Sequence, residues 1–177
     1  MRGLDGNATY RPFNGLTVTA AVTYLDSKVE TYGGVNIIGL QQNFSGVSLP
    51  FSSKWSGLVD AEYRLSRANG GSPFLGFTVN SRSATDAALA GADITYPLTN
   101  TNRLAPGIVH PFAIDAYTTM DVRVGYETAD RRWKVIFWGK NILDRYYWTD
   151  VIAASDSTSR LAGMPATCGV SFGYKYR

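Results

Sequence analysis

The strongest constraint on the fold is a two-residue alternation of apolar and polar side chains that recurs along the whole chain. In its first run, Leu4, Ala8 and Tyr10 share one set of positions, while polar residues from Asp5 to Thr9 share the other. Successive side chains of a β-strand point to opposite faces, so this period predicts strands with one apolar and one polar face. We expect seven strands, at about 4–11, 16–24, 55–64, 75–80, 119–126, 133–140 and 167–176.

Segment 133–140 fits the alternation least well. Its Ile136 and Trp138 occupy the positions at which Lys134 and Lys140 indicate a polar face. The sixth strand is therefore predicted from a less regular pattern than the other six, whereas the last segment shows the cleanest alternation of the chain.

The order of the connections is as informative as the strands. Short turns that contain Gly, Asn or Asp alternate with long polar stretches, and the first connection is a short one. The short turns lie at 12–15, 67–71 and 128–131, and the long stretches at about 26–51, 83–112 and 150–164. An antiparallel meander with this order has tight turns at one end and long loops at the other, as transmembrane barrels do. The sequence thus predicts an all-β fold, an antiparallel meander of about seven strands that forms part of a transmembrane β-barrel.

Alternation alone does not say whether the apolar face meets lipid or a protein core, because an antiparallel sheet with one solvated face has the same period. Two features favour lipid. Aromatic residues gather near strand ends, where membrane barrels have their interfacial girdles: Tyr10, Tyr24, Trp55, Tyr63, Tyr126, Trp133 and Tyr176. The opposite face carries charges typical of a wet lumen: Asp60, Glu62, Arg64, Asp121, Arg123 and Lys175.

Composition excludes several classes of function. The chain has one cysteine, Cys168, and one histidine, His110, so an intramolecular disulfide is impossible and a protein-only zinc site is not expected. Its net charge of +3 is spread without a basic cluster, which argues against a nucleic-acid partner. The sequence shows neither an apolar run long enough for a transmembrane helix nor a secretory signal peptide. We expect no cofactor.

Candidate binding residues lie in the second long stretch, because loops on a rigid scaffold often carry binding. These are Asp86, Asp93, Tyr96, Arg103 and His110, for which a solvated loop is the alternative interpretation. Arg82, Lys140 and Arg145 could attract an anionic chelate, although charges that merely keep the lumen wet would look the same.

Enzymatic chemistry is not expected. The pairs Asp60–Glu62 and Asp121–Arg123 lie two residues apart on one strand face, but nothing in the sequence indicates the cleft that an acid–base pair requires. A charge network in the lumen is the better interpretation of both pairs. A serine hydrolase would need a histidine beside its nucleophile, and the single His110 falls in a predicted loop.

One segment carries a family resemblance. Trp138–Tyr147 reads WGKNILDRYY, which resembles the NLFD(K/R)xY signature near the end of TonB-dependent receptors, and 163–165 with the last strand is similar to that family's closing G.PR segment. The matching signature residues are Asn141, Ile142, Leu143, Asp144, Tyr146, Tyr147, Gly163 and Pro165. The stretch 49–55 and the hairpin 10–27 resemble other late barrel segments of these receptors. Ile142–Leu143 stands for the usual Leu-Phe, Ala166 for a common Arg, and the chain ends on Arg177 rather than on an aromatic residue.

The resemblance implies an outer-membrane receptor of a Gram-negative bacterium that takes up a scarce substrate, such as siderophore-bound iron, cobalamin or a carbohydrate. Residues 1–177 would be the C-terminal segment of the barrel domain, without plug or signal peptide. Because such transporter barrels have roughly twenty-two strands, seven strands alone would not transport anything.

The resemblance also implies the partners. These are the outer-membrane lipid, the remainder of the receptor (plug and N-terminal strands), TonB through that missing N-terminal part, and the barrel-assembly machinery. The assembly machinery would recognise the C-terminal sorting strand through Phe172, Tyr174 and Tyr176.

Two alternatives remain open at this stage. One is a small self-contained outer-membrane barrel of eight strands, such as an adhesin or a membrane enzyme. The other is a soluble carbohydrate-binding β-sandwich, which would be monomeric without detergent, whereas a barrel segment would be insoluble.

Overall fold

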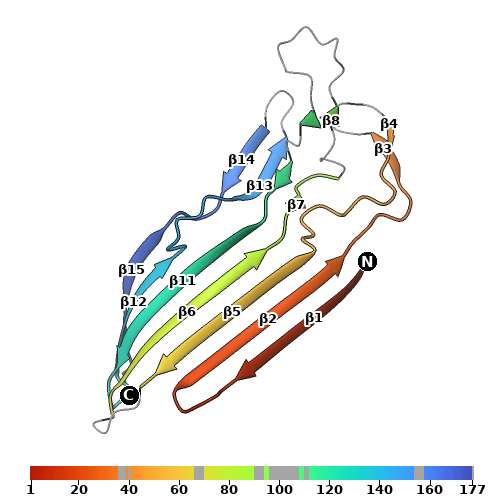
Figure 1. Ribbon diagram of the computed structural model, residues 1–177. Coiled ribbons are helices and arrows are strands. Elements are labelled where there is room, and N and C mark those ends of the chain that lie inside the picture. The colour runs from red at the N-terminus through yellow and green to blue at the C-terminus, as the bar shows by residue number, and fades with distance from the viewer. Residues whose placement is uncertain are drawn as a thin grey trace.

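The computed structural model describes residues 1–35, 39, 41–65, 70–89, 94–95, 108–109, 112–153 and 158–176. Its main feature is one seven-stranded antiparallel sheet (Figure 1). In spatial order the strands are β1 (Arg2–Tyr10), β2 (Leu16–Asp26), β5 (Trp55–Arg64), β6 (Ser72–Arg82), β11 (Tyr117–Glu127), β12 (Trp133–Lys140) and β15 (Thr167–Tyr174). This order follows the sequence, so the predicted meander is confirmed. No helix in these ranges is long and apolar enough to cross a membrane.

The long connections contain short strands that the sequence did not predict. They form four two-stranded pairs: β3 (Gly33–Val35) with β4 (Gln41–Asn43), β7 (Thr85–Asp86) with β10 (Ala113–Ile114), β8 (Ile94–Thr95) with β9 (Ile108–Val109), and β13 (Trp148–Ala153) with β14 (Thr158–Ala162). All four lie at one end of the sheet, opposite the C-terminus (Figure 1). A long connection that pairs with itself satisfies its own backbone donors and acceptors.

The loop end also has a small hydrophobic core. Phe112, Ile114 and Val151 are buried against one another, and Trp148 packs against them with two alanines of the segment that follows β7. The three buried side chains come from the second and third long connections. This cluster therefore ties β13 to the β7–β10 pair, although the two segments are far apart in the chain.

The tight turns lie at the other end. In the β1–β2 turn, Gly15 has φ +92°, and a side chain there would collide with the carbonyl of Arg64. In the β11–β12 turn, the hydroxyl of Thr128 donates to Asp130 Oδ1 at 2.6 Å and the amide of Arg132 donates to the same oxygen at 3.1 Å. These two donors favour the carboxylate and hold the pKa of Asp130 below its ordinary value.

One face of the sheet is apolar from edge to edge. Directly paired residues share a face, and the register aligns Val22 with Gly57, and Phe137 with both Val124 and Val170. These side chains are uncovered: Val22 is 51% exposed and Val170 61%. A soluble sandwich would bury such a face against a second sheet. An apolar surface of this extent is what lipid, rather than water, would cover.

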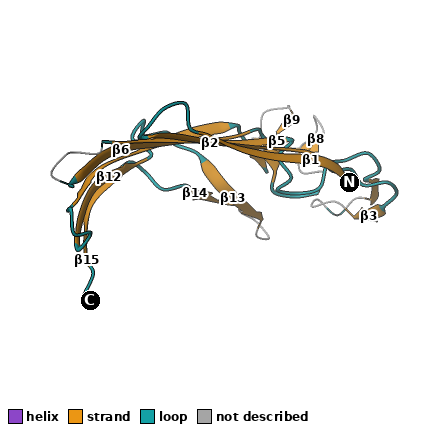
Figure 2. Cartoon of the chain, turned by 90° about the horizontal axis from the view of Figure 1, so that it is seen from below, coloured by secondary structure: helices purple, strands orange, loops and turns teal. Residues whose placement is uncertain are grey.

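The opposite face is polar and concave. Figure 2 shows an arched sheet with the β13–β14 hairpin on its concave side. Tyr147, the residue before that hairpin, stacks on Tyr117 of the polar face with ring centroids 4.2 Å apart. The polar face is therefore the inner face of the arch, as expected for the wall of a barrel with a wet lumen.

The irregular sixth strand has a packing explanation. β12 runs without a break, and Trp138 lies on the polar face across from Gly169 of β15. A Cβ at Gly169 would lie 2.5 Å from the Trp138 ring, so glycine leaves the space that the indole fills. The indole Nε1 donates to Ser171 Oγ at 3.0 Å, which satisfies its polar group. Phe74 lies over Gly125 in the same way and is only 4% exposed.

Candidate functional site

The family-like signature forms a hydrogen-bonded turn between β12 and β13. Asn141 is 3% exposed, and its Nδ2 donates to the carbonyls of Arg145 and Met164, both at 2.9 Å. Its Oδ1 accepts the amide of Arg145 at 3.0 Å, and its own amide donates to Asp121 Oδ1 at 2.9 Å. One side chain thus joins the turn to the segment that enters β15.

Asp144 makes a second tie to the same segment. Its Oδ1 accepts the amide of Ala166 at 3.1 Å. Both Asn141 and Asp144 have φ +47°, a left-handed conformation that Asn and Asp tolerate better than most residues. Leu143 is exposed, whereas the half-exposed Ile142 places its Cγ2 against Gly139. Asn141 and Asp144 of the signature thus have a structural role, because they tie the turn after β12 to the segment that enters β15.

The turn places Tyr147 over the polar face. Gly163 lies directly beneath this ring, where any side chain would collide with it, and the Gly163 amide donates to the Tyr147 carbonyl at 2.8 Å. Tyr146 points elsewhere, is exposed, and meets Trp148 edge to face at 4.9 Å. Pro165 is exposed in the link that precedes β15.

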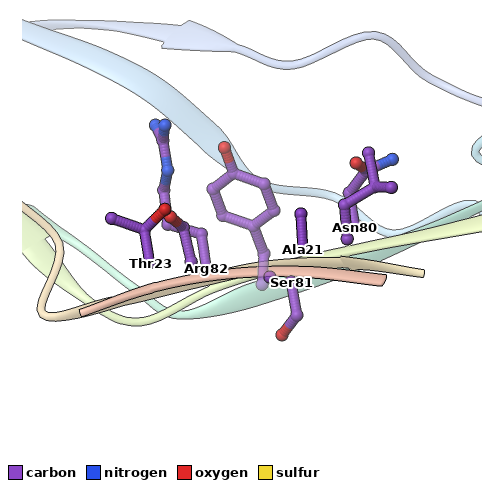
Figure 3. Close-up of a pocket in the computed structure, with 9 residues that line it drawn as sticks. Ala21, Thr23, Asn80, Ser81 and Arg82 are labelled. Carbon is purple, nitrogen blue, oxygen red and sulfur yellow. The ribbon is translucent and has the colours of Figure 1, made fainter. Parts of the chain in front are cut away.

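A hollow lies on the polar face where four strands reach the loop end. Its volume is about 330 Å³, and its lining includes Thr23 of β2, Ser56 of β5, Asn80 and Arg82 of β6, and Tyr117 of β11. Figure 3 shows Thr23, Asn80 and Arg82 on one side of the sheet and Ser81 on the other. The strand register brings these residues together, because Arg82 pairs with both Ser56 and Tyr117.

A second hollow of about 340 Å³ adjoins the first and shares Arg82 and Tyr117 with it. Its further lining includes Arg145, from the signature turn. The site is therefore built from two parts: a floor on β6 and β11 and an overhang that Asn141 and Gly163 hold in place. We call the two hollows together the loop-end hollow.

Charge divides the polar face into two regions. Towards the tight turns, Arg123 bridges Asp60 at 2.7 Å and Glu62 at 3.1 Å, and Arg64 bridges Glu62 at 3.1 Å and Glu127 at 3.2 Å. This network joins β5 to β11 across β6 and confirms the predicted role of Asp60, Glu62 and Arg123, whereas Asp121 instead accepts the amide of Asn141. It leaves each arginine matched by two carboxylates.

The two arginines that line the loop-end hollow are not paired in this way by the described residues. In the described part of the chain, neither Arg82 nor Arg145 forms an ion pair with a carboxylate. Within the same residues there is also no group of three or more His, Cys, Asp or Glu that could hold a metal ion. The lining of the hollow therefore includes two cationic groups and the ring of Tyr117, which stacks on Tyr147, and this arrangement is suited to an anion.

The structure places the other predicted residues as follows. Asp86 lies in β7 at the loop end, while Asp93, Tyr96, Arg103 and His110 lie outside the described residues. In the last strand, Phe172 and Tyr174 are exposed and pack on Trp133 of β12, with centroids 5.1 and 4.3 Å apart, and Tyr176 is exposed beyond the strand. Their use as a sorting signal stays a prediction.

Sequence reasoning missed most of the floor of the hollow. It named Arg82 and Arg145 as possible anion-attracting charges, but not Tyr117 or Asn80. The signal was present in part, since Asn80, Arg82 and Tyr117 lie on the polar face near the ends of strands that adjoin a long connection.

The comparisons bear on the family and the fold. Residues 1–142 match the family described as TonB dependent receptor-like, beta-barrel. Three similar solved structures are the ferric yersiniabactin uptake receptor FyuA of Yersinia pestis, the siderophore receptor PiuA of Acinetobacter baumannii, and BauA, the ferric preacinetobactin receptor of the same organism. Their TM-scores are 0.69, 0.69 and 0.64, at 14%, 14% and 19% identity.

The alignments cover 99%, 98% and 97% of this chain but only 23%, 21% and 21% of those receptors. The chain thus spans less than a quarter of the length of these structures. No curated protein matches it.

Proposed function

Because the chain belongs to the family of TonB-dependent receptor-like β-barrels, we propose that it forms part of the barrel wall of an outer-membrane receptor that takes up siderophore-bound iron. The family consists of receptors and transporters of the Gram-negative outer membrane, not of enzymes. Siderophores are the favoured substrate class, rather than cobalamin or carbohydrates, because one structural neighbour is named a siderophore receptor and the other two are named receptors for ferric compounds.

The observation that carries the proposal is the two-faced arch. Its outer face is apolar and uncovered, while its inner face holds the charge network and the loop-end hollow. Lipid against the outer face and water or protein against the inner face would satisfy both surfaces. A soluble sandwich would require a second layer over the apolar face.

Strand parity supports a larger barrel. The sheet has seven alternating strands, so its edge strands β1 and β15 run in the same direction. Pairing these two edges directly would give a parallel contact, whereas single-chain bacterial barrels are antiparallel throughout and have an even number of strands. Closure thus needs an odd number of further strands. The same parity argues against a self-contained barrel made of this sheet alone.

Each surface of the sheet would contact a different partner. Residues 1–177 would be the C-terminal segment of the barrel domain, with the missing strands against β1 and β15 and the receptor's plug inside the arch. The family implies TonB and a plug domain as partners of the full protein, and TonB would act through the plug. Phe172, Tyr174 and Tyr176 would face the assembly machinery.

Fractionation of the source cells tests the proposal. An antibody against residues 167–176 should detect, in the outer membrane, a protein several times heavier than 19.3 kDa. Disruption of its gene should lower the uptake of radioactive iron from at least one siderophore under iron limitation. A 19.3 kDa band in the soluble fraction would contradict the proposal.

A further inference from the structure

We infer that the loop-end hollow binds an anionic ligand through a planar aromatic group, with Arg82 and Arg145 as the charge partners and Tyr117, held by its stack on Tyr147, as the aromatic contact. This inference rests on the proposed function and narrows its substrate class. The expected substrates are anionic iron chelates with aromatic ligand groups, and not neutral chelates.

The arginines of the polar face differ in whether a carboxylate neutralises them. Arg64 and Arg123 each contact two carboxylates, so their positive charge is largely neutralised within the sheet. Arg82 of β6 and Arg145 of the signature turn line one hollow, and neither has a carboxylate partner among the described residues. Two guanidinium groups that converge on one concave space raise its positive potential and favour an anion.

The aromatic rings beside the hollow are held rigidly. The rings of Tyr117 and Tyr147 stack at 4.2 Å with an interplanar angle of 25°. Tyr117 is held in β11 by its pairing with Arg82 of β6, and Tyr147 is held by Gly163 and the Asn141 turn. A flat surface that is already ordered loses little entropy when a planar group packs beside it. Aromatic stacking and a nearby guanidinium are complementary to a phenolate or catecholate ring.

The remaining lining is polar and short. Thr23, Ser56 and Asn80 border the Arg82 side of the hollow, and Thr23 already donates its hydroxyl to Asp5 Oδ1 at 2.6 Å. Asn80 can donate or accept, and Ser56 offers a hydroxyl. Ser56 and Asn80 can therefore hydrogen-bond the oxygens of a chelate, whereas the Thr23 hydroxyl is engaged by the Asp5 carboxylate.

The test uses the full-length receptor, purified from the outer membrane in detergent, and two iron complexes. Iron(III) tris-catecholate is a trianion with aromatic ligands, and an iron(III) tris-hydroxamate is neutral and non-aromatic. Equilibrium binding of radioactive iron is compared for the native receptor, Arg82→Gln and Tyr117→Leu. Arg132→Gln is the control, because this arginine is exposed in a tight turn at the other end, where its only described carboxylate partner is Asp130 at 3.7 Å.

We expect the native receptor to prefer the tris-catecholate. Arg82→Gln and Tyr117→Leu should each weaken its binding by roughly ten-fold or more, which corresponds to about 1.4 kcal/mol, while Arg132→Gln leaves it unchanged. Added salt should weaken binding to the native receptor more than to Arg82→Gln, because the attraction of this guanidinium is screened. The shift in gel mobility on heating verifies that each variant is folded.

Three results would overturn the inference. Equal binding of the tris-catecholate by the native receptor and both variants would show that the hollow is not the site. Preference for the tris-hydroxamate would remove the anionic class but leave the proposed function intact. Binding of neither complex, with iron uptake unchanged on gene disruption, would remove the proposed function as well.

Discussion

Replacing Asn141 by alanine removes three hydrogen bonds from a buried position. The Asn141 side chain donates to two carbonyls and accepts one amide, at distances of 2.9, 2.9 and 3.0 Å. Alanine leaves these backbone groups of Arg145 and Met164 without their partner at a side-chain position that is 3% exposed. It must also adopt the φ of +47° that asparagine tolerates.

The expected loss of stability follows from these two terms. Each hydrogen bond contributes about 1 kcal/mol net, and the left-handed conformation costs a residue such as alanine roughly 1–2 kcal/mol. We therefore expect Asn141→Ala to lower the free energy of unfolding by about 4–5 kcal/mol. Asn141→Gly loses the same hydrogen bonds but adopts this φ freely, so it should lower the free energy by about 3 kcal/mol.

Urea unfolding of the full-length receptor in phospholipid vesicles, followed by tryptophan fluorescence, measures both values. The difference between the two variants isolates the backbone conformation, because their hydrogen-bond losses are equal. If Asn141→Ala unfolds within about 0.5 kcal/mol of the native receptor, the range of ordinary surface substitutions, the structural role assigned to the signature is wrong.

The same assay tests two features of the sheet. Gly169→Ala should lower the unfolding free energy by roughly 1–3 kcal/mol, because its Cβ would lie 2.5 Å from the Trp138 ring; Gly6→Ala, which has nothing within 4 Å, should cost far less. Equal effects would mean that the indole does not occupy this space. Val22→Arg, on the apolar face, should cost about 2–4 kcal/mol and reduce the folded receptor in the membrane. Asn7→Arg, at an exposed position on the polar face, should be tolerated. If Asn7→Arg destabilised the receptor more than Val22→Arg, the polar face would be the one that contacts lipid.

The positions and faces of the seven main strands followed from the sequence, because both depend on local properties, although the ends differ: β6, for example, spans Ser72–Arg82 where 75–80 was expected. Side-chain direction in a strand alternates whatever the neighbours are, and Gly15 or Asp130 favours a turn through its own conformation or hydrogen bonds. The alternation of short and long connections then determined the antiparallel order and the end at which the loops gather. Residues 141–147 were recognised as a family signature from the sequence as well, although their role as a turn was not.

Contacts between strands decided the rest. Trp138 broke the sequence pattern because its space is set by Gly169, a residue on the neighbouring strand, and no local period encodes that pair. The loop-end hollow likewise joins residues that are distant in the chain: the register of β6 with β11 places Arg82 beside Tyr117, and the signature turn brings Tyr147 onto that ring. A strand pattern specifies which face a residue occupies, whereas register and loop packing specify which residues meet on that face. The seven strands and their apolar and polar faces could therefore be predicted from the sequence, whereas the loop-end hollow could be found only in the tertiary structure.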